Sequence, residues 1–194
     1  MNIKKKITVT TLALMAFLTS HFSQAETVTA DADSFKCLTE MTAVRGFFVD
    51  NLLGDLQATI EAAKAPNGAV YPVGSVVQLV PTEVMVKREK GYNQVTKDWE
   101  FFELDVSDKG SKINVRGAFE VVNKFGGNCF GCHIKAKPQW DMICEQEHGC
   151  DPITLPNGMI LTQAMIKGAQ KADPRCATAA QQQVHDALVQ VAAN

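Results

Sequence analysis

The sequence has no apolar run long enough to span a membrane, because a bilayer-spanning helix needs roughly twenty apolar residues. The run at 7–18 is about a dozen residues long, follows three lysines and precedes the small residues Ser23 and Ala25. A short apolar run between a basic start and small residues is typical of a secretory signal peptide. No cysteine directly follows the run, which argues against a lipoprotein anchor. The sequence therefore predicts a signal peptide over 1–25, cleavage after Ala25 and export to the periplasm.

The chain also has no basic excess. It contains 19 Lys and Arg against 21 Asp and Glu, and the predicted cleavage removes three lysines and no acid, which leaves a net charge of −5. Because no basic stripe is present, neither nucleic acid nor an anionic membrane surface is an expected partner. A negatively charged surface instead favours docking to a basic partner protein.

No internal repeat and no low-complexity tract divides the 169 residues that remain after cleavage. This length is enough for one domain with a sizeable core, so we expect a single domain over 26–194. The order of apolar patterns predicts an α+β fold. An N-terminal helix and an antiparallel β-sheet come first, and a late sequence motif, an irregular segment and C-terminal helices follow.

Three segments have the apolar spacing of helices. In the first, Ser34 is a candidate N-cap, and apolar residues recur at helical spacing as far as Ala65, before the turn residues at 66–68. We therefore expect one long helix over 34–65. The other two expected helices are 161–167 and 178–193.

Runs of β-branched and aromatic residues between turn signals predict the sheet. The turn residues at 107–110 separate two such runs and predict a hairpin. A further run at 118–122 is expected to extend the sheet. The expected strands before that extension are 75–80, 84–87, 99–106 and 112–116.

Residues 129–133 are Cys-Phe-Gly-Cys-His, the attachment pattern of c-type haem. Two thiols at this spacing can add to the two vinyl groups of one porphyrin, and His133 then serves as the proximal ligand of the iron. We therefore expect one covalent haem c on Cys129 and Cys132. The glycines at 126–127 would let the backbone approach the macrocycle closely.

A zinc site is the alternative interpretation of the same residues. Cys129 and Cys132 would form it together with two further donors close by in the sequence. The candidates for these two donors are His133, Cys144, His148 and Cys150. Export to an oxidising compartment and the histidine directly after the second cysteine favour haem.

Four cysteines remain once two carry haem, and an even number in an exported protein favours two disulfides. Four cysteines allow three pairings. We expect Cys144 to pair with Cys150, which closes a small loop, and Cys37 to pair with Cys176, which ties the two ends of the domain together.

The distal ligand of the iron would decide between functions, because a methionine raises the redox potential and suits electron transfer. Met159 follows the turn residues at 156–158 and is the candidate for this position. The other residues that offer a suitable side chain are Met85, Met142, Met165, His148 and His185.

Three stretches resemble one known family, the cytochrome P-460 and cytochrome c′-β family. They are Tyr71-Pro72-Val73-Gly74-Ser75-Val76-Val77, Trp99-Glu100-Phe101-Phe102 and the motif from Cys129 to His133. The resemblance covers 34–140 and leaves 141–194 as a C-terminal extension. It implies an N-terminal helix, an antiparallel sheet before the haem motif, an open distal side walled by the sheet, and a homodimer. By this resemblance Cys129 and Cys132 bind haem and His133 is its proximal ligand.

In cytochrome P-460 a lysine on a sheet strand is cross-linked to the porphyrin and supports hydroxylamine oxidation. In this sequence the strand after Tyr71-Pro72 carries Gln78 and no lysine, and Lys87 lies on the next segment. The sequence therefore leaves enzyme activity open. A general acid or base over the distal face would be sought among the charged residues of the predicted hairpin, Glu100, Glu103 and Arg116.

Two functions remain as expectations. The first is an exported mono-haem c-type cytochrome that transfers electrons in the periplasm to or from a redox partner protein, with the negative charge favouring a basic one. The second is a five-coordinate haem protein of cytochrome P-460 or c′-β type that binds or oxidises a small ligand such as nitric oxide or hydroxylamine.

Overall fold

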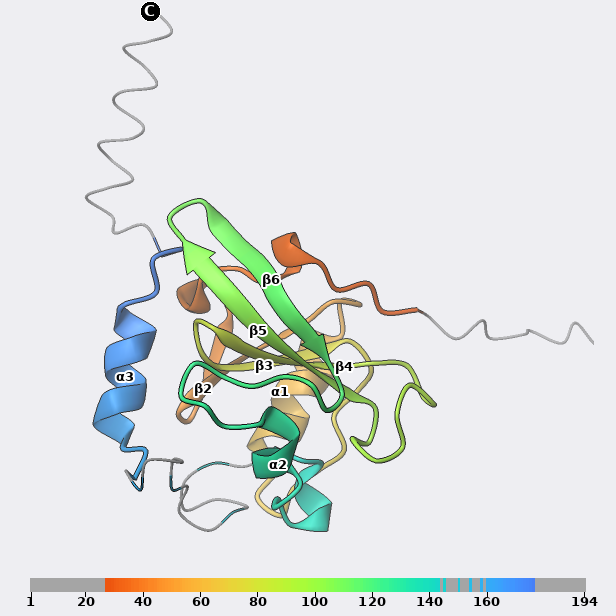
Figure 1. Ribbon diagram of the computed structural model, residues 1–194. Coiled ribbons are helices and arrows are strands. Elements are labelled where there is room, and N and C mark those ends of the chain that lie inside the picture. The colour runs from red at the N-terminus through yellow and green to blue at the C-terminus, as the bar shows by residue number, and fades with distance from the viewer. Residues whose placement is uncertain are drawn as a thin grey trace, which may run out of the picture.

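The structure is a computed structural model of the chain (Figure 1). It describes residues 27–143, 145, 150, 154, 158 and 160–176. The predicted signal peptide at 1–25 and the predicted helix at 178–193 lie outside these residues. Within them, no helix combines the length and the apolar character needed to cross a membrane.

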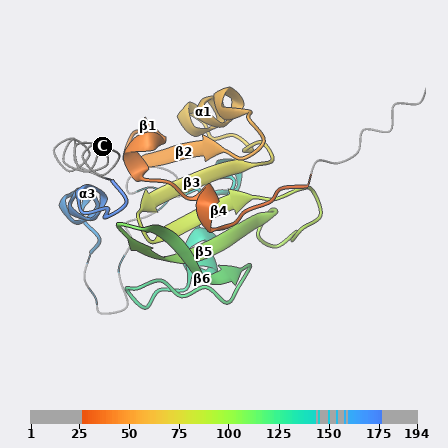
Figure 2. The same ribbon diagram turned by 90° about the horizontal axis from the view of Figure 1, so that it is seen from above.

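A six-stranded antiparallel sheet forms the centre of the described chain, with its strands in sequence order from β1 to β6 (Figure 2). The strands are β1 Thr42–Val44, β2 Phe47–Asn51, β3 Ser75–Val80, β4 Glu83–Lys87, β5 Trp99–Ser107 and β6 Gly110–Gly117. The helices are α1 Leu56–Lys64, α2 Cys129–His133 and α3 Gln163–Lys171, with short 3-10 turns η1 Ala32–Ser34, η2 Leu38–Glu40 and η3 Pro138–Trp140. The predicted α+β class is confirmed.

Four strands fall where the sequence predicts them. β3 has the predicted bounds, and β4 begins one residue earlier than expected. β5 and β6 form the predicted hairpin, in which Ser107 pairs with Gly110 across the turn. β-branched and aromatic residues bounded by turn residues therefore located these strands correctly.

The long helix predicted over 34–65 is wrong for most of its length. Residues 42–51 form the hairpin of β1 and β2, and only α1 is α-helical. The chain reverses at Arg45, whose φ is 52°. In β2 burial alternates from residue to residue, and Val49 pairs with Val77 of β3. Pairing with β3 therefore overrides the helical spacing, which aromatic and β-branched residues support only weakly.

Segment 118–122 does not extend the sheet, contrary to the prediction. β6 ends at Gly117, whose φ of 152° is one that other residues rarely adopt. Val122 then forms only an isolated bridge to Asn128. The chain from 118 to 128 is therefore a loop that leads from the edge of the described sheet into α2.

The two nine-residue helices each begin at a side-chain cap. The Asp55 carboxylate accepts a hydrogen bond from the N–H of Ala58 at 3.3 Å and starts α1. The Thr162 hydroxyl accepts one from the N–H of Met165 at 3.3 Å and starts α3. The helix predicted at 161–167 is thus present, displaced toward the C-terminus by its cap.

The sheet has a hydrophobic core on each face, because successive side chains of a strand point to opposite faces. The first core contains Val76, Phe102 and Leu104, covered by Val28 and Phe35 of the N-terminal segment. Figure 2 shows the N-terminal segment and α2 on opposite sides of the sheet.

The second core lies on the face that α1 and α2 cover. It contains Val77, Met85 and Phe101 of the three central strands, with Ala63 of α1 and Cys129 of α2. The motif is therefore built directly against the middle of the sheet, where the backbone is most constrained by pairing on both sides.

A disulfide joins Cys37 to Cys176, which is the pairing expected from the sequence. Asp173 supports the same junction, because its carboxylate accepts a hydrogen bond from the N–H of Leu38 at 3.0 Å and pairs with Arg175 at 2.8 Å. The segment after α3 is thus tied to the N-terminal segment that covers the first core.

Replacing both cysteines of this disulfide with alanine should lower the free energy of unfolding by about 2–4 kcal/mol, because the cross-link closes a long loop. The two cysteines are 139 residues apart in the sequence. Urea unfolding of wild type and of the double variant Cys37→Ala/Cys176→Ala measures the difference. An unchanged unfolding midpoint would contradict a stabilising role for the bond.

Candidate functional site

Helix α2 carries the whole Cys-Phe-Gly-Cys-His motif in little more than one turn. Its N-cap is Asn128, whose side-chain oxygen accepts a hydrogen bond from the N–H of Gly131 at 2.9 Å. This bond satisfies an N–H group that has no partner within the helix. Cys129 and Cys132 are three residues apart and therefore lie on the same side of the helix.

The loop before α2 is held by its own hydrogen bonds. The side-chain oxygen of Asn123 accepts from the N–H groups of Phe125 at 3.0 Å and Gly127 at 2.8 Å. The N–H of Cys129 donates to the carbonyl of Val121 at 3.0 Å. The first thiol of the motif therefore has a fixed position relative to the loop.

His133 ends α2, and one hydrogen bond sets its tautomer. Its Nδ1 lies 2.7 Å from the carbonyl oxygen of Met142. A carbonyl oxygen only accepts, so Nδ1 carries the proton and Nε2 keeps a free lone pair. Burial lowers the pKa of His133 below its ordinary value, which keeps the imidazole neutral. A neutral imidazole with a free Nε2 is the form that binds a metal.

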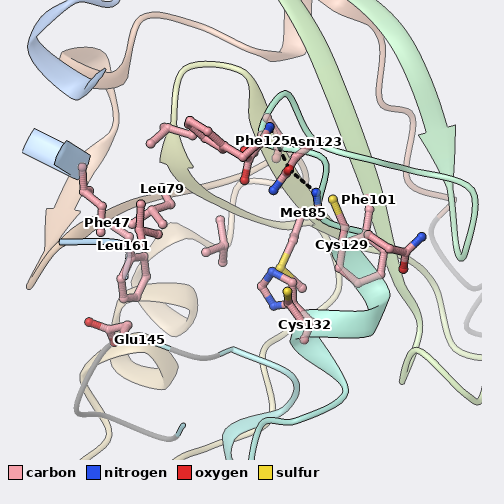
Figure 3. A pocket seen from close by; sticks show the side chains of 18 of the residues that line it. Phe47, Leu79, Met85, Phe101, Asn123, Phe125, Cys129, Cys132, Glu145 and Leu161 are labelled. Atoms are coloured by element: carbon pink, nitrogen blue, oxygen red, sulfur yellow. Dashed lines mark hydrogen bonds between the residues drawn. The ribbon is translucent and has the colours of Figure 1, made fainter. Parts of the chain in front are cut away.

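A cavity of about 680 Å³ lies against α2 and is lined by Cys129, Cys132 and His133. This volume is in the range of sites that hold small molecules and cofactors. Figure 3 shows the side chains of Met85, Phe101, Cys129 and Cys132 on one side of the cavity and those of Phe47, Leu79, Leu161 and Glu145 on the other. The motif therefore opens onto a space with mainly apolar walls.

Both motif thiols are free. Burial raises the pKa of the Cys129 thiol to about 12, so this side chain is uncharged at neutral pH. Cys150 is disulfide-bonded. Its predicted partner, Cys144, lies outside the described residues.

The zinc alternative loses support in this arrangement. Cys150, one of its predicted donors, is already in a disulfide. Tetrahedral zinc also needs ligand atoms roughly 4 Å apart. Within the described part of the chain, one cluster of three such atoms within 4.8 Å of one another is present. It consists of Cys37, Asp173 and Cys176 and contains the disulfide, whereas Cys129, Cys132 and His133 form no such cluster.

Met159, the distal ligand predicted from the sequence, lies outside the residues that the structure describes. The candidates outside the described residues are Met159, His148 and His185. Met85 of β4 and Met165 of α3 line the cavity. The Met142 side chain is buried in the core beside the motif, and the backbone carbonyl of Met142 accepts the hydrogen bond from His133.

The two residues compared with the cross-linking lysine of cytochrome P-460 do not line the cavity. The Gln78 side-chain amide donates to the carbonyls of Val80 at 3.2 Å and Pro81 at 2.8 Å. The Lys87 ammonium is paired with Asp141 at 2.8 Å. Both side chains are therefore engaged elsewhere.

The charged residues of the β5–β6 hairpin do not line the cavity either. Glu100 accepts hydrogen bonds from Arg88 and Arg116, and Arg116 also donates to the carbonyl of Ala30 in the segment that covers the first core. Glu103 accepts from Asn114 at 2.6 Å. Glu100, Glu103 and Arg116 are therefore hydrogen-bonded to other parts of the protein. None of these three residues is placed to act on a bound molecule.

Glu83 at the start of β4 does line the cavity, and sequence reasoning missed it. Its Oε1 atom is buried and has no hydrogen-bond partner among the described residues. Burial raises the pKa of Glu83 to about 7; the Asn123 side chain hydrogen-bonds the carboxyl and opposes this shift, whereas the nearby Glu103 adds to it. A charged residue directly after a turn usually faces solvent, so no local signal in the sequence indicates this burial.

No protein-family model, no curated protein and no solved structure matches the chain. The resemblance to the cytochrome P-460 and c′-β family therefore stays a prediction from the residues. The arrangement of α2 and the cavity carries the functional argument.

The raised pKa of Glu83 makes the free energy of unfolding depend on pH. Between pH 4.5, the ordinary pKa, and pH 7, the unfolded chain loses this proton while the folded chain keeps it, so the free energy of unfolding falls as pH rises. Replacing Glu83 with glutamine should remove this decline. Relative to wild type, the variant should gain roughly 1–3 kcal/mol between pH 4.5 and pH 8.

Urea unfolding at pH 4.5, 6 and 8 measures this change. The exposed Glu40 offers a matched control, because Glu40→Gln removes a carboxyl that has no part in the cavity. Equal pH dependence in Glu83→Gln and wild type would show that Glu83 is not buried in its acid form.

Proposed function

We propose that the chain is an exported mono-haem c-type cytochrome that transfers electrons in the periplasm. One observation carries the proposal. Two free thiols and a histidine with a free Nε2 line the same cavity of about 680 Å³ within five residues of one helix.

The donor set fits a covalent haem. Each motif thiol is available for addition across a vinyl group, in which the sulfur bonds one carbon and the thiol proton goes to the other. The neutral His133 offers Nε2 to the iron, because its Nδ1 proton is bonded to Met142. The haem iron supplies the reversible one-electron chemistry when it is bound.

The chain's own residues supply the surroundings. Phe101 packs against the His133 ring with centroids 5.4 Å apart and restricts its rotation. Cys129 and Cys132 would keep the cofactor attached even where the cavity opens to solvent. The apolar walls exclude water, which strengthens electrostatic interactions inside the site.

A second function is favoured by the opposite side of the cavity. Phe47, Leu79 and Leu161 form an apolar wall there, which suits a small uncharged ligand such as nitric oxide on a five-coordinate iron (Figure 3). Glu83 adds a carboxyl within the same cavity. Hydroxylamine oxidation by the route of cytochrome P-460 would need a cross-linked lysine, and Lys87 is paired with Asp141 instead.

Export and partners belong to the same proposal. The predicted signal peptide at 1–25 directs the chain to an oxidising compartment, and the Cys37–Cys176 disulfide fits that compartment. The net charge of −5 after cleavage favours a basic redox partner. The family resemblance adds a homodimer.

The visible spectrum of the purified, reduced protein tests the cofactor. We expect a haem spectrum that stays with the chain after denaturation and acid–organic extraction, because thioether bonds hold it. The double variant Cys129→Ala/Cys132→Ala should lose all covalently bound haem. A wild-type protein without haem would overturn the proposal and return the motif to metal binding.

Carbon monoxide then separates the two functions. A reduced spectrum that carbon monoxide leaves unchanged indicates a six-coordinate iron and favours the electron carrier. A spectrum that shifts on its addition indicates an open distal position and favours ligand binding. A basic and an acidic redox protein, compared at low and high salt, test the partner charge, because steering by charge weakens with ionic strength.

A further inference from the structure

A buried ion pair lies behind the motif, outside the cavity. Lys87 Nζ is 2.8 Å and 3.0 Å from the two carboxylate oxygens of Asp141, and the two side chains are only 7% and 2% exposed. Lys87 also donates to the carbonyl of Lys97 at 2.7 Å. Desolvation offsets much of the attraction in such a pair, so stability alone is a weak account of it.

Asp141 begins a turn in an uncommon backbone conformation. Asp141 and Met142 have φ values of 50° and 67°, in the left-handed region that residues other than glycine rarely adopt. Two further hydrogen bonds hold Asp141 there. Its carboxylate accepts from the N–H of Tyr71 at 2.9 Å, and its carbonyl accepts from the indole N–H of Trp99 at 2.7 Å.

The next carbonyl along the chain is the one that sets the tautomer of His133. The Met142 carbonyl accepts the Nδ1 proton at 2.7 Å. Its direction depends on the backbone dihedrals of the left-handed turn, and the turn depends on where Asp141 is held. The contacts thus run without a gap from Lys87 on β4 through Asp141 and Met142 to His133.

We infer that Lys87 and Asp141 are positioning residues for His133. The ion pair holds the turn at 141–142 so that the Met142 carbonyl accepts the Nδ1 proton and leaves Nε2 as the donor atom. This role rests on the proposed haem function. It gives Lys87, which lies outside the cavity, a role that needs no cross-link to the cofactor.

The strength of the Nδ1 hydrogen bond has a measurable effect on a bound iron. A stronger bond makes the imidazole a more basic ligand, and a more basic ligand favours the oxidised iron. Weakening the bond should therefore raise the midpoint potential. It should also let the Nδ1 proton exchange faster with water, because a bonded proton exchanges slowly.

Three variants separate positioning from stability. Lys87→Met and Asp141→Asn each leave a buried charge without its partner, so both should unfold at lower urea concentration than wild type. The double variant Lys87→Met/Asp141→Asn has no unpaired charge, and its unfolding midpoint should return toward wild type. Asparagine tolerates the left-handed region and can still accept from the Tyr71 N–H.

The structure offers a matched control in the ion pair Asp173–Arg175, whose side chains are 0% and 3% exposed. It supports the disulfide junction through Leu38 and, within the described part of the chain, has no hydrogen bond or ion pair with the motif. The double variant Asp173→Asn/Arg175→Met should change the unfolding midpoint and leave the potential of the haem unchanged.

The experiment measures the midpoint potential and the exchange rate of the His133 Nδ1 proton by NMR in the intact haem protein. In the Lys87/Asp141 double variant we expect the equilibrium constant for reduction to rise roughly tenfold, 59 mV for one electron, while stability recovers. Proton exchange should accelerate by a similar factor. A potential and an exchange rate that return to wild type together with stability would overturn the positioning role. Absence of haem from the wild type would overturn the proposed function, and the positioning role with it.

Discussion

Strand β4 is buried on both faces, and the surroundings of the motif depend on this constraint. Val84 and Val86 face the core beneath the N-terminal segment, whereas Glu83, Met85 and Lys87 alternate with them and face the side of α2. Glu83 lies at the cavity, Met85 forms part of the cavity wall, and Lys87 belongs to the ion pair behind the motif. A register slip of one residue would exchange the two sets, so pairing with β3 and β5 places this chemistry.

The sequence predicted well the elements that depend on neighbouring residues. It predicted poorly those that depend on residues far away in the chain. The strands at 75–80 and 99–106 combine β-branched and aromatic residues with turn signals, and they were predicted nearly to the residue. The helix over 34–65 failed because its apolar spacing suits a helix, while the pairing of β2 with β3 depends on residues about thirty positions away. The burial of Glu83 and the contact between Lys87 and Asp141 are likewise products of the fold. The motif at 129–133 could be recognised in the sequence because the predicted haem attachment needs two cysteines and a histidine at fixed spacing within five residues.

The site combines one rigid end with one open end. Around α2, the Asn128 cap, the bond from Cys129 to Val121 and the bond from His133 to Met142 hold the donor atoms in place. The opposite wall consists mainly of apolar side chains and places few constraints on what lies against it. Such a division suits a cofactor that is attached and ligated from one side, because orientation then comes from the attachment and the rest of the cavity needs only to exclude water.

The disulfide between Cys37 and Cys176 has a consequence for the chemistry of the other thiols. Disulfide exchange proceeds through thiolates, so a cysteine that stays protonated reacts slowly with an existing disulfide. The motif cysteine Cys129 is buried and stays protonated at neutral pH, while the pair that closes the domain is already oxidised. The protonated Cys129 would therefore react slowly with an existing disulfide, so the fold keeps this thiol chemically apart from the sulfurs of Cys37 and Cys176.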